Sequence, residues 1–330
     1  MDWDAVDWDS LERMRTAFLA GTSGQADYWQ SESDLASYDF TFGRRIGWKW
    51  DCVLGELARR GWRPPAGEVL DWGCGTGVAA RAFLKHFGET TAHGIVLHDR
   101  SAPARDFASR KVRGTYPSAS VRREAASDVS APTVLVSHVR GELSDRQLEC
   151  LMSVVRRATA VVWIEPGSFD VSRQLIDIRE QLRGEFQLVA PCTHQGVCGM
   201  LASGSERHWC HHFAPSAPEV HTDGNWVRFG RIAGIDLRSL PFSYLVLDRH
   251  PPPPLPAGAV RVIGRPRVHK GLALLFGCQE DGVRDRRLAK SSLPEEFRQV
   301  RRGDFGTLQA WRLDGDKIIA VERLPEFADR

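Results

Sequence analysis

The sequence predicts an α/β protein built on a doubly wound, parallel sheet. Short apolar segments alternate with longer helical segments from about residue 67 to about residue 182, and this alternation is typical of parallel strands connected by helices. A glycine-rich turn follows the first strand, and acidic side chains end several strands. Because ligands bind at the carboxyl ends of the strands in such sheets, we expect the functional site at that edge.

Each strand is indicated by an apolar, often β-branched run that ends at a polar or turn-forming residue. The run Thr-Val-Leu-Val-Ser-His-Val at residues 133–139 is the clearest, because it is almost without charge. The expected strands are residues 68–71, 92–97, 118–123, 133–139, 160–164, 187–189 and 242–247.

The helices between these strands are indicated by apolar residues at helical spacing and by capping residues. Trp50, Val53, Leu54 and Leu57 fall on one helical face, which we interpret as packing against the sheet, and Ser144 is placed to cap a helix that begins at Asp145. The expected helices are residues 11–19, 48–60, 78–87, 102–112, 145–158 and 172–182.

Composition argues against several classes of protein. The 330 residues are 42% hydrophobic and 26% charged, as in ordinary globular proteins. No apolar run is long enough to span a membrane, and the acidic start Met-Asp-Trp-Asp does not resemble a signal peptide, so we expect a cytoplasmic protein.

The net charge is only +2, but basic residues concentrate near the C-terminus. Residues 261–302 contain eleven Lys or Arg against five Asp or Glu, a local charge of +6. Such a segment is typical of nucleic-acid binding, and a solvated basic surface is the alternative.

The glycine-rich turn lies at Asp71-Trp72-Gly73-Cys74-Gly75-Thr76-Gly77, and a second strand ends at His98-Asp99. The glycines allow the backbone to pass close under a ligand, and an acid at the end of the second strand of a nucleotide-binding fold takes the ribose hydroxyls. A plain turn is the alternative. The pattern resembles motifs I and II of class I S-adenosylmethionine (SAM) methyltransferases. We expect the SAM-binding residues to be Asp71, Gly73, Cys74, Gly75, Thr76, Gly77, Asp99, Arg100 and Ser137.

Two further polar residues are expected at the same edge of the sheet, His138 after the fourth strand and Glu165 after the fifth. A histidine at a strand end is more often a hydrogen-bonded edge residue than a base. Glu165 precedes Pro-Gly, so it could equally brace the turn.

Seven cysteines in a chain without an export signal indicate thiol chemistry or metal binding rather than disulfides. Cys192, Cys198 and Cys210 lie within nineteen residues in a segment rich in Gly, Pro and His, and Cys278 follows an apolar strand. Because residues 190–240 lack apolar periodicity, we expect a metal to hold them. Four thiolates suit zinc or an iron-sulfur cluster, and histidines at 194, 208, 211 and 212 are further candidate ligands. The alternative to a metal site is that these cysteines are separate buried thiols. Cys52, Cys74 and Cys150 are interpreted as structural.

Several blocks in order resemble the methyltransferase-like family of small-ribosomal-subunit proteins, whose mitochondrial members are assembly factors. The blocks begin at Leu70, Ile164, Ala190, Trp209, Phe242 and Gly264, and the similarity runs from about Trp50 to about Phe305. The resemblance implies a class I methyltransferase fold with a cysteine-bearing insertion, a 4Fe-4S cluster on Cys192, Cys198, Cys210 and Cys278, and contact with small-subunit rRNA through residues 261–302. The sequence departs from the usual pattern of this family in two places: in the helix at residues 38–54, and at Trp72, which is bulkier than the usual small or aliphatic residue.

We expect three regions along the chain. Residues 1–66 form an N-terminal helical region, residues 67–250 form the SAM-methyltransferase-like domain with a Cys-rich insertion at 190–240, and residues 251–330 form a basic β-rich extension. In the extension, residues 306–312 and 317–322 are expected to form a hairpin. Phe297, Phe305 and Trp311 are candidate RNA contacts, with core packing as the alternative.

Three functions follow from these features. The first is an rRNA methyltransferase, although the chain has Ser137-His138-Val139 where amino-nitrogen methyltransferases carry Asn-Pro-Pro-Tyr or Asp-Pro-Pro-Tyr. The second is a non-catalytic rRNA-binding assembly factor whose cluster is structural or senses redox state. The third, a lesser one, is an RNA cytosine-5 methyltransferase with Cys192 in Pro191-Cys192 as nucleophile.

Overall fold

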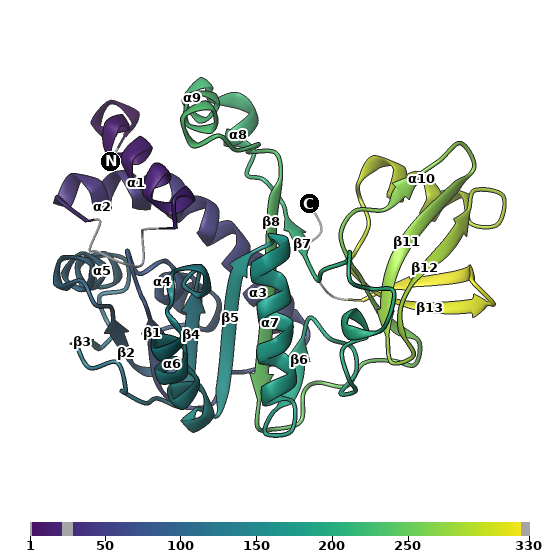
Figure 1. Cartoon of the computed structure of the whole chain (residues 1–330), viewed down its shortest axis with the longest axis horizontal. Coiled ribbons are helices and arrows are strands. Elements are labelled where there is room, and N and C mark those ends of the chain that lie inside the picture. The colour runs from purple at the N-terminus through teal and green to yellow at the C-terminus, as the bar shows by residue number, and fades with distance from the viewer. Residues whose placement is uncertain (1, 22–28, 325–330) are drawn as a thin grey trace. The chain divides into compact units, whose positions relative to one another are not determined.

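The computed structural model describes residues 2–21 and 29–324 (Figure 1). The chain forms two compact units. The first unit comprises Met1–Leu54, Arg63–Glu165 and Phe213–Leu240, and the second comprises Gly55–Trp62, Pro166–His212 and Pro241–Arg330. These units alternate along the chain, whereas the three regions expected from the sequence are consecutive, so the expected boundaries stay a prediction.

The first unit carries a parallel sheet in the strand order β3-β2-β1-β4-β5, seen side by side in Figure 1. Trp72 at the end of β1 lies opposite His98 in β2 and Val136 in β4, so the carboxyl ends of the central strands are level. The strands are β1 (Gly67–Trp72), β2 (Ala92–His98), β3 (Val121–Glu124), β4 (Thr133–Ser137) and β5 (Ala160–Pro166).

The helices of this sheet agree closely with the sequence pattern. Helix α4 (Val78–Phe87) has the predicted bounds, and Ser144 caps α6 (Asp145–Arg157) in a capping box with Gln147. The other helices of the first unit are η1 (Trp3–Ala5), α1 (Trp8–Leu19), α2 (Glu32–Tyr38), η2 (Asp39–Gly43), the start of α3 (Arg44–Arg59), α5 (Ala102–Thr115), η3 (Arg140–Glu142), α8 (Glu219–Thr222) and α9 (Gly224–Ala233).

The expectation that a metal holds all of residues 190–240 is wrong for the second half of that range. Residues 219–233 form α8 and α9, whose buried Trp226 and Phe229 pack with aromatic rings of the N-terminal region. The ring of Trp3 lies edge-on to Trp226 at 5.0 Å, and Phe42 lies edge-on to Phe229 at 4.8 Å. An aromatic core therefore stabilises this segment.

The second unit contains α7 (Phe169–Leu182) and an antiparallel pair of strands, β6 (Gln187–Ala190) and β8 (Leu240–Asp248). The remaining short elements are η4 (Gly199–Leu201) and β7 (His212–Ala214), where the chain passes from the second unit to the first.

The C-terminal part of the second unit is a separate, mostly antiparallel sheet with one helix. Its described strands have the order β10-β11-β12-β14-β13-β9, and β9 also pairs with β11, so the sheet closes on itself. The elements are β9 (Ala259–Val262), β10 (Arg267–Val268), β11 (Leu272–Gln279), β12 (Gly282–Ala289), α10 (Pro294–Arg302), β13 (Leu308–Asp314) and β14 (Lys317–Arg323).

The expected hairpin is confirmed as β13 and β14, which turn at Gly315 with φ 61°. The suggestion that nearby aromatic residues contact RNA is wrong for Phe297 and Trp311, which are buried in the core of this sheet. Phe305 packs against the same core. None of the helices within residues 2–21 and 29–324 is long and apolar enough to cross a membrane.

Candidate functional site

The glycine loop between β1 and α4 has a backbone that side chains would obstruct. Gly73, Gly75 and Gly77 have φ values of 72°, 49° and 77°, in the left-handed region that favours glycine. A Cβ on Gly73 would lie 2.7 Å from Cγ1 of Val139, whereas a Cβ on Gly75 would meet no atom within 4 Å. The loop therefore packs tightly at Gly73 and leaves open space at Gly75.

This loop forms one wall of a cavity of about 390 Å³ in the first unit. Of the residues expected to bind SAM, those that line the cavity are Gly73, Cys74, Gly75, Thr76, Asp99, Arg100 and Ser137. His138 also lines it, and so does Cys150, which the sequence had suggested to be structural. The other walls carry no motif that predicts them, and they include Trp29, Tyr38 and Ile46 from the N-terminal region and Leu143 and Gln147 near α6.

Asp71 lies beneath the loop and is not among the residues that line the cavity. Its Oδ2 accepts a hydrogen bond of 3.1 Å from the backbone N–H of Ala80 in α4, and its buried Oδ1 has no partner in the described residues. Burial raises the pKa of Asp71 to about 7. This carboxyl group thus braces the start of α4 and keeps one acceptor unused.

Asp99 links the second strand to the glycine loop. Its Oδ2 accepts from the N–H of Gly75 at 2.9 Å, and its Oδ1 accepts from the N–H of Ser101 at 2.9 Å. Burial raises the pKa of Asp99 above its usual range. Since a carboxylate oxygen has two lone pairs, both oxygens can still accept a hydrogen bond from a hydroxyl in the cavity.

The end of β4 carries a buried polar group that the sequence identified only in part. His138 has a positive φ of 55°, and its Nε2 lies 3.1 Å from Nζ of Lys49, a residue of α3 that the sequence did not single out. Trp50 donates its Nε1–H to Ser137 Oγ at 2.9 Å. Burial lowers the pKa of Lys49 to about 7, and burial also lowers the pKa of His138. Near neutral pH this pair can hold or release a proton beside the cavity.

Glu165 at the end of β5 braces the turn after β4. Its Oε1 accepts from the N–H groups of Val139 and Arg140 at 3.3 and 3.0 Å and from Trp163 Nε1 at 2.7 Å. Burial raises the pKa of Glu165 to about 7. These hydrogen bonds hold the turn after β4, whereas the sequence had suggested a bracing role at the Pro-Gly turn that follows Glu165 itself.

The four thiols expected to bind metal lie in one region of the second unit. Cys198 and Cys278 are buried in a small core with Ile176 and Met200, and Cys210 packs against it. Cys192, Cys198, Cys210 and Cys278 are free thiols. Burial raises the pKa of Cys198, Cys210 and Cys278, and neighbouring thiolates raise it further, with Cys192 contributing in each case. The thiols are thus close enough to oppose one another's ionisation.

The side chains as they stand do not form a finished metal site. Among the described residues, no group of three or more His, Cys, Asp or Glu is arranged to hold a metal ion. The donor set nevertheless fits a thiophilic metal, since four free sulfurs gather in one buried region and a positive centre between them would offset their mutual repulsion.

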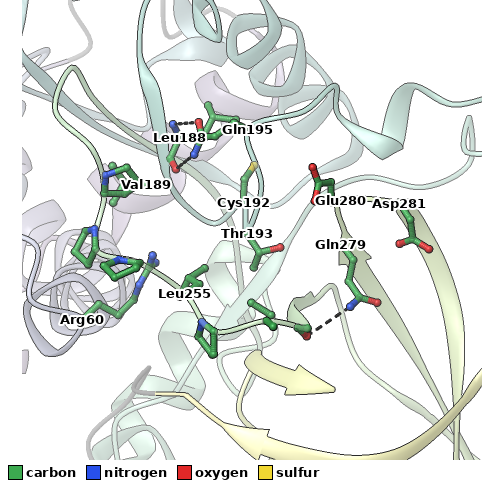
Figure 2. Close-up of a pocket in the computed structure, with 17 residues that line it drawn as sticks. Arg60, Leu188, Val189, Cys192, Thr193, Gln195, Leu255, Gln279, Glu280 and Asp281 are labelled. Carbon is green, nitrogen blue, oxygen red and sulfur yellow. Dashed lines mark hydrogen bonds between the residues drawn. The ribbon is translucent and has the colours of Figure 1, made fainter. Parts of the chain in front are cut away.

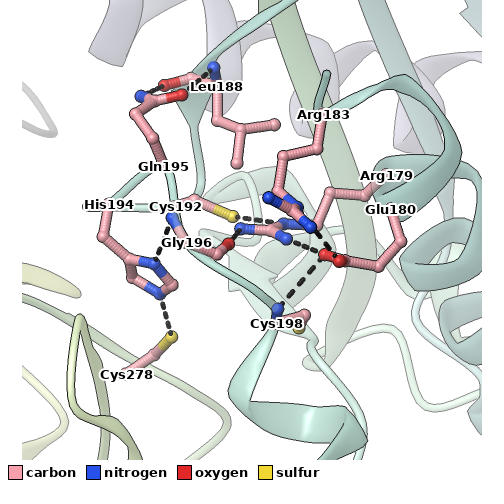
Figure 3. A network of polar contacts seen from close by, with 10 residues as sticks. All are labelled: Arg179, Glu180, Arg183, Leu188, Cys192, His194, Gln195, Gly196, Cys198 and Cys278. Carbon is pink, nitrogen blue, oxygen red and sulfur yellow. Dashed lines mark hydrogen bonds and ion pairs between the residues drawn. The ribbon is translucent and has the colours of Figure 1, made fainter.

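A buried arginine connects two of the thiol segments (Figure 3). Arg179 in α7 donates Nε–H to Cys192 Sγ at 3.3 Å and Nη2–H to the carbonyl oxygen of Gly196 at 2.7 Å. It also pairs with Glu180, whose Oε1 accepts from the N–H of Cys198 at 3.1 Å. His194 Nε2 lies 3.7 Å from Cys278 Sγ.

A second cavity, of about 460 Å³, opens beside Cys192 (Figure 2). Its walls include Thr193 and Gln195, the proline-rich residues 252–256 and the acids Glu280 and Asp281. Gln195 is held by two hydrogen bonds to the backbone of Leu188, of 2.7 and 2.9 Å. Small molecules can thus approach the Cys192 segment from this side.

Part of the basic segment 261–302 is structural. Arg261 is buried and pairs with Glu56, with Nη2 donating to Oε1 at 2.6 Å and Nη1 donating to Oε2 at 3.0 Å. Arg286 is also buried and pairs with Asp281. The expectation that the whole segment faces RNA is wrong for these two residues.

The parallel strand order, the glycine loop after β1 and the acid after β2 define a Rossmann-like class I methyltransferase sheet. The chain also matches the protein family described as mitochondrial small ribosomal subunit Rsm22, over residues 51–311. The protein therefore belongs to the Rsm22 family.

Similar solved structures are methyltransferases of low sequence identity. The plantazolicin methyltransferase BamL is 10% identical, with 73% of this chain and 98% of that chain covered and a TM-score of 0.42. The magnesium protoporphyrin IX methyltransferase of Synechocystis with bound SAM is 12% identical, with coverage of 73% and 98% and a TM-score of 0.38. An RNA methyltransferase candidate from Pyrococcus horikoshii is 13% identical, with coverage of 60% and 83% and a TM-score of 0.37. No curated protein matches the chain.

Proposed function

We propose that this protein binds SAM in the glycine-loop cavity and acts on or with the RNA of the small ribosomal subunit. The observation that carries the proposal is a cavity built from Gly73, Gly75 and Asp99 in a chain of the Rsm22 family. Location in the cytoplasm stays a prediction.

The residues around the cavity can be given distinct roles toward the cofactor. The loop at Gly75 lets the ligand approach the backbone, Asp99 accepts from ribose hydroxyls, and the unused Oδ1 of Asp71 provides negative charge beneath the loop for a cationic end. Cys74, Thr76, Gly77, Arg100 and Ser137 complete the proposed set. SAM would supply an activated methyl group.

The proposal includes methyl transfer as its first form. An acceptor N–H or O–H loses a proton when it is methylated, and the pair of His138 and Lys49 beside the cavity can take that proton near neutral pH. The acceptor atom is not specified by this pair.

A non-catalytic assembly factor is the second candidate. One observation favours it: Ser137 and His138 stand where amino-nitrogen methyltransferases carry their acceptor motif, and both are engaged with α3 through Trp50 and Lys49. A cytosine-5 mechanism is the least supported, because Cys192 is not among the residues that line the glycine-loop cavity and its sulfur accepts from Arg179.

We further propose that Cys192, Cys198, Cys210 and Cys278 bind a 4Fe-4S cluster, with zinc as the alternative. The support is a set of four free, clustered thiols together with family membership. The cluster would supply a staple for the segment between β6 and β7, or a redox sensor. Arg179 would then lie beside one cysteine ligand and hold its loop.

Three measurements test these proposals separately. Calorimetric titration with SAM tests the cavity, and transfer of labelled methyl groups from SAM to small-subunit rRNA separates the enzyme from the assembly factor. Iron, sulfide and zinc analysis of protein purified without oxygen tests the thiols. Cys192→Ser should lose the metal, whereas the control Cys150→Ser should keep it. Full metal retention in Cys192→Ser with loss of methyl transfer would instead support the nucleophile.

A further inference from the structure

The closed sheet of the second unit has a specific topology. Five of its strands form a closed ring, in which neighbours pair in the order β9-β11-β12-β14-β13 and back to β9. If the five strands are numbered one to five along the chain, this order is one, two, three, five, four and back to one. The pair β12–β14 is parallel, and the other pairs in the ring are antiparallel. This five-stranded Greek-key barrel is the arrangement of the OB-fold.

The helix and the core agree with this assignment. Helix α10 follows the third strand of the ring, as Figure 1 shows beside β11 and β12, and its Phe297 and Val300 are buried against the barrel interior. Trp311 fills the centre, where a Cβ on Gly277 would lie 2.7 Å from its ring. The barrel is therefore a packed domain core rather than an open ribbon.

OB-folds bind oligonucleotides or oligosaccharides across strands two and three and the loops at one end. Here these strands are β11 and β12. One end of their outer face is covered by the cysteine-bearing segment between β6 and β7. A Cβ on Gly199 of that segment would lie 2.6 Å from Val283, and the ring of His208 packs on Phe276 with 4.6 Å between centroids. The other end, around Leu272 and Leu274, is only partly buried.

The open end carries positive charge. The connection between β9 and β11, which contains β10, exposes Arg267, His269 and Lys270. Strand β12 leads to exposed Lys290, whose backbone N–H donates to the carbonyl oxygen of Gly271. Within residues 2–21 and 29–324, Lys270 and Lys290 make no ion pair.

The acids on this face are already neutralised. Arg267 pairs with Asp285, and Arg287 lies 3.7 Å from Asp316. Such exposed pairs contribute little to stability, so the arginines can exchange their partners for phosphates.

We propose that the open end of β11–β12, with the loop at residues 264–271, binds single-stranded RNA. Its positive charge favours a polyanion over a neutral oligosaccharide, and an open face of two strands beside an exposed His269 ring suits an RNA strand whose bases are free to stack. This inference deepens the proposed function by naming the RNA-binding surface and the form of RNA that it takes.

The test is fluorescence anisotropy of the full chain with a labelled single-stranded RNA of about twelve nucleotides and with its duplex. Lys270→Glu combined with Lys290→Glu should weaken single-strand binding about tenfold or more and reduce the salt slope by about 1.4, because two phosphate contacts are lost. The matched control, Arg301→Glu with Arg302→Glu, makes the same charge change on exposed residues of α10 and should change affinity less than about threefold.

A third variant separates stacking from charge. His269→Ala should weaken binding about fivefold or more and leave the salt slope unchanged. Equal losses in the lysine variant and the α10 control, or equal affinity for duplex and single strand, would overturn the inference. Association of the wild-type protein with small subunits without affinity for single-stranded RNA would overturn it while leaving the proposed function intact.

Discussion

Replacement of Asp71 by Asn is expected to change how stability depends on pH. The pKa of Asp71 rises from 3.8 to about 7 because the carboxyl group is buried. Between these values the folded state holds a proton that the unfolded state has released, so the free energy of unfolding falls as pH rises. Asn carries no charge in either state, and the variant avoids this loss.

The magnitude follows from the two pKa values. Integrated between about pH 4.5 and about pH 8.5, the wild-type protein should lose about 3 kcal/mol of stability relative to the variant. The unpaired amide N–H₂ that Asn places at buried Oδ1 costs about 1–3 kcal/mol, but this cost does not depend on pH. The difference between the two pH dependences therefore isolates the carboxyl group.

Urea unfolding of both proteins without ligand at several pH values is the assay. Parallel curves of stability against pH would refute the reasoning, because they would mean that Asp71 titrates alike in the folded and unfolded states. The same variant also tests the proposed site. If Asp71 faces the cationic end of SAM, the affinity for SAM should fall about tenfold, which corresponds to about 1.4 kcal/mol.

Three further changes have defined outcomes. Burial lowers the pKa of Lys49 from 10.5 to about 7, so the stability of the wild-type protein should rise with pH across that range. Lys49→Met should remove this rise when urea unfolding is measured at several pH values. Identical slopes of stability against pH in the two proteins would contradict this. Gly77→Ala should lower the free energy of unfolding by about 1–2 kcal/mol because its φ is positive, and by more because the added Cβ would crowd Ala108 of α5. Gly234→Ala, with φ 61° and no atom near the added Cβ, should show the backbone cost alone, and thermal unfolding of the two variants compares them. Glu56→Gln should lower the free energy of unfolding by about 3–5 kcal/mol, because it leaves buried arginines without a carboxylate. The exposed Glu295→Gln should lower it by under about 1 kcal/mol in the same urea assay. Similar losses in both variants would show that the buried pair has no special role.

The parallel sheet could be predicted because its signals are local. The helix at Val78–Phe87 begins after a glycine with positive φ and ends before Gly88, so both bounds are visible in the sequence. The strand at Thr133–Ser137 is apolar because both faces of a parallel sheet are covered. The glycine loop and Asp99 then follow from the positions of these strands.

The barrel and its binding face could not be predicted in this way. Its closure depends on β9 pairing with both β11 and β13, which join residues far apart in the sequence. Charge counting also placed Arg261 with the surface arginines, although it is paired with Glu56 inside the unit. Only the register of the strands distinguishes such an inward arginine from an exposed one.

Lys49 shows the same limit for the cavity. Nothing near it in the sequence marks it as functional, and it reaches His138 only because α3 packs beside the end of β4. The aromatic segment around Trp226 was missed for a related reason, since its partners lie in the first fifty residues.

Some buried ionisable groups of this protein are ion-paired and others are not. In the second unit Glu56 is paired with Arg261 and Arg60, and these pairs stabilise its charged form. In the first unit Asp71 and Lys49 have no ion pair among the described residues, and burial shifts the pKa of each toward neutrality. Unpaired groups of this kind reduce stability, and they occur where a ligand or a proton transfer needs them. Asp71 lies beneath the glycine loop and Lys49 contacts His138 in the cavity wall, so the cost of burying these two groups supports the proposal that a ligand binds in that cavity.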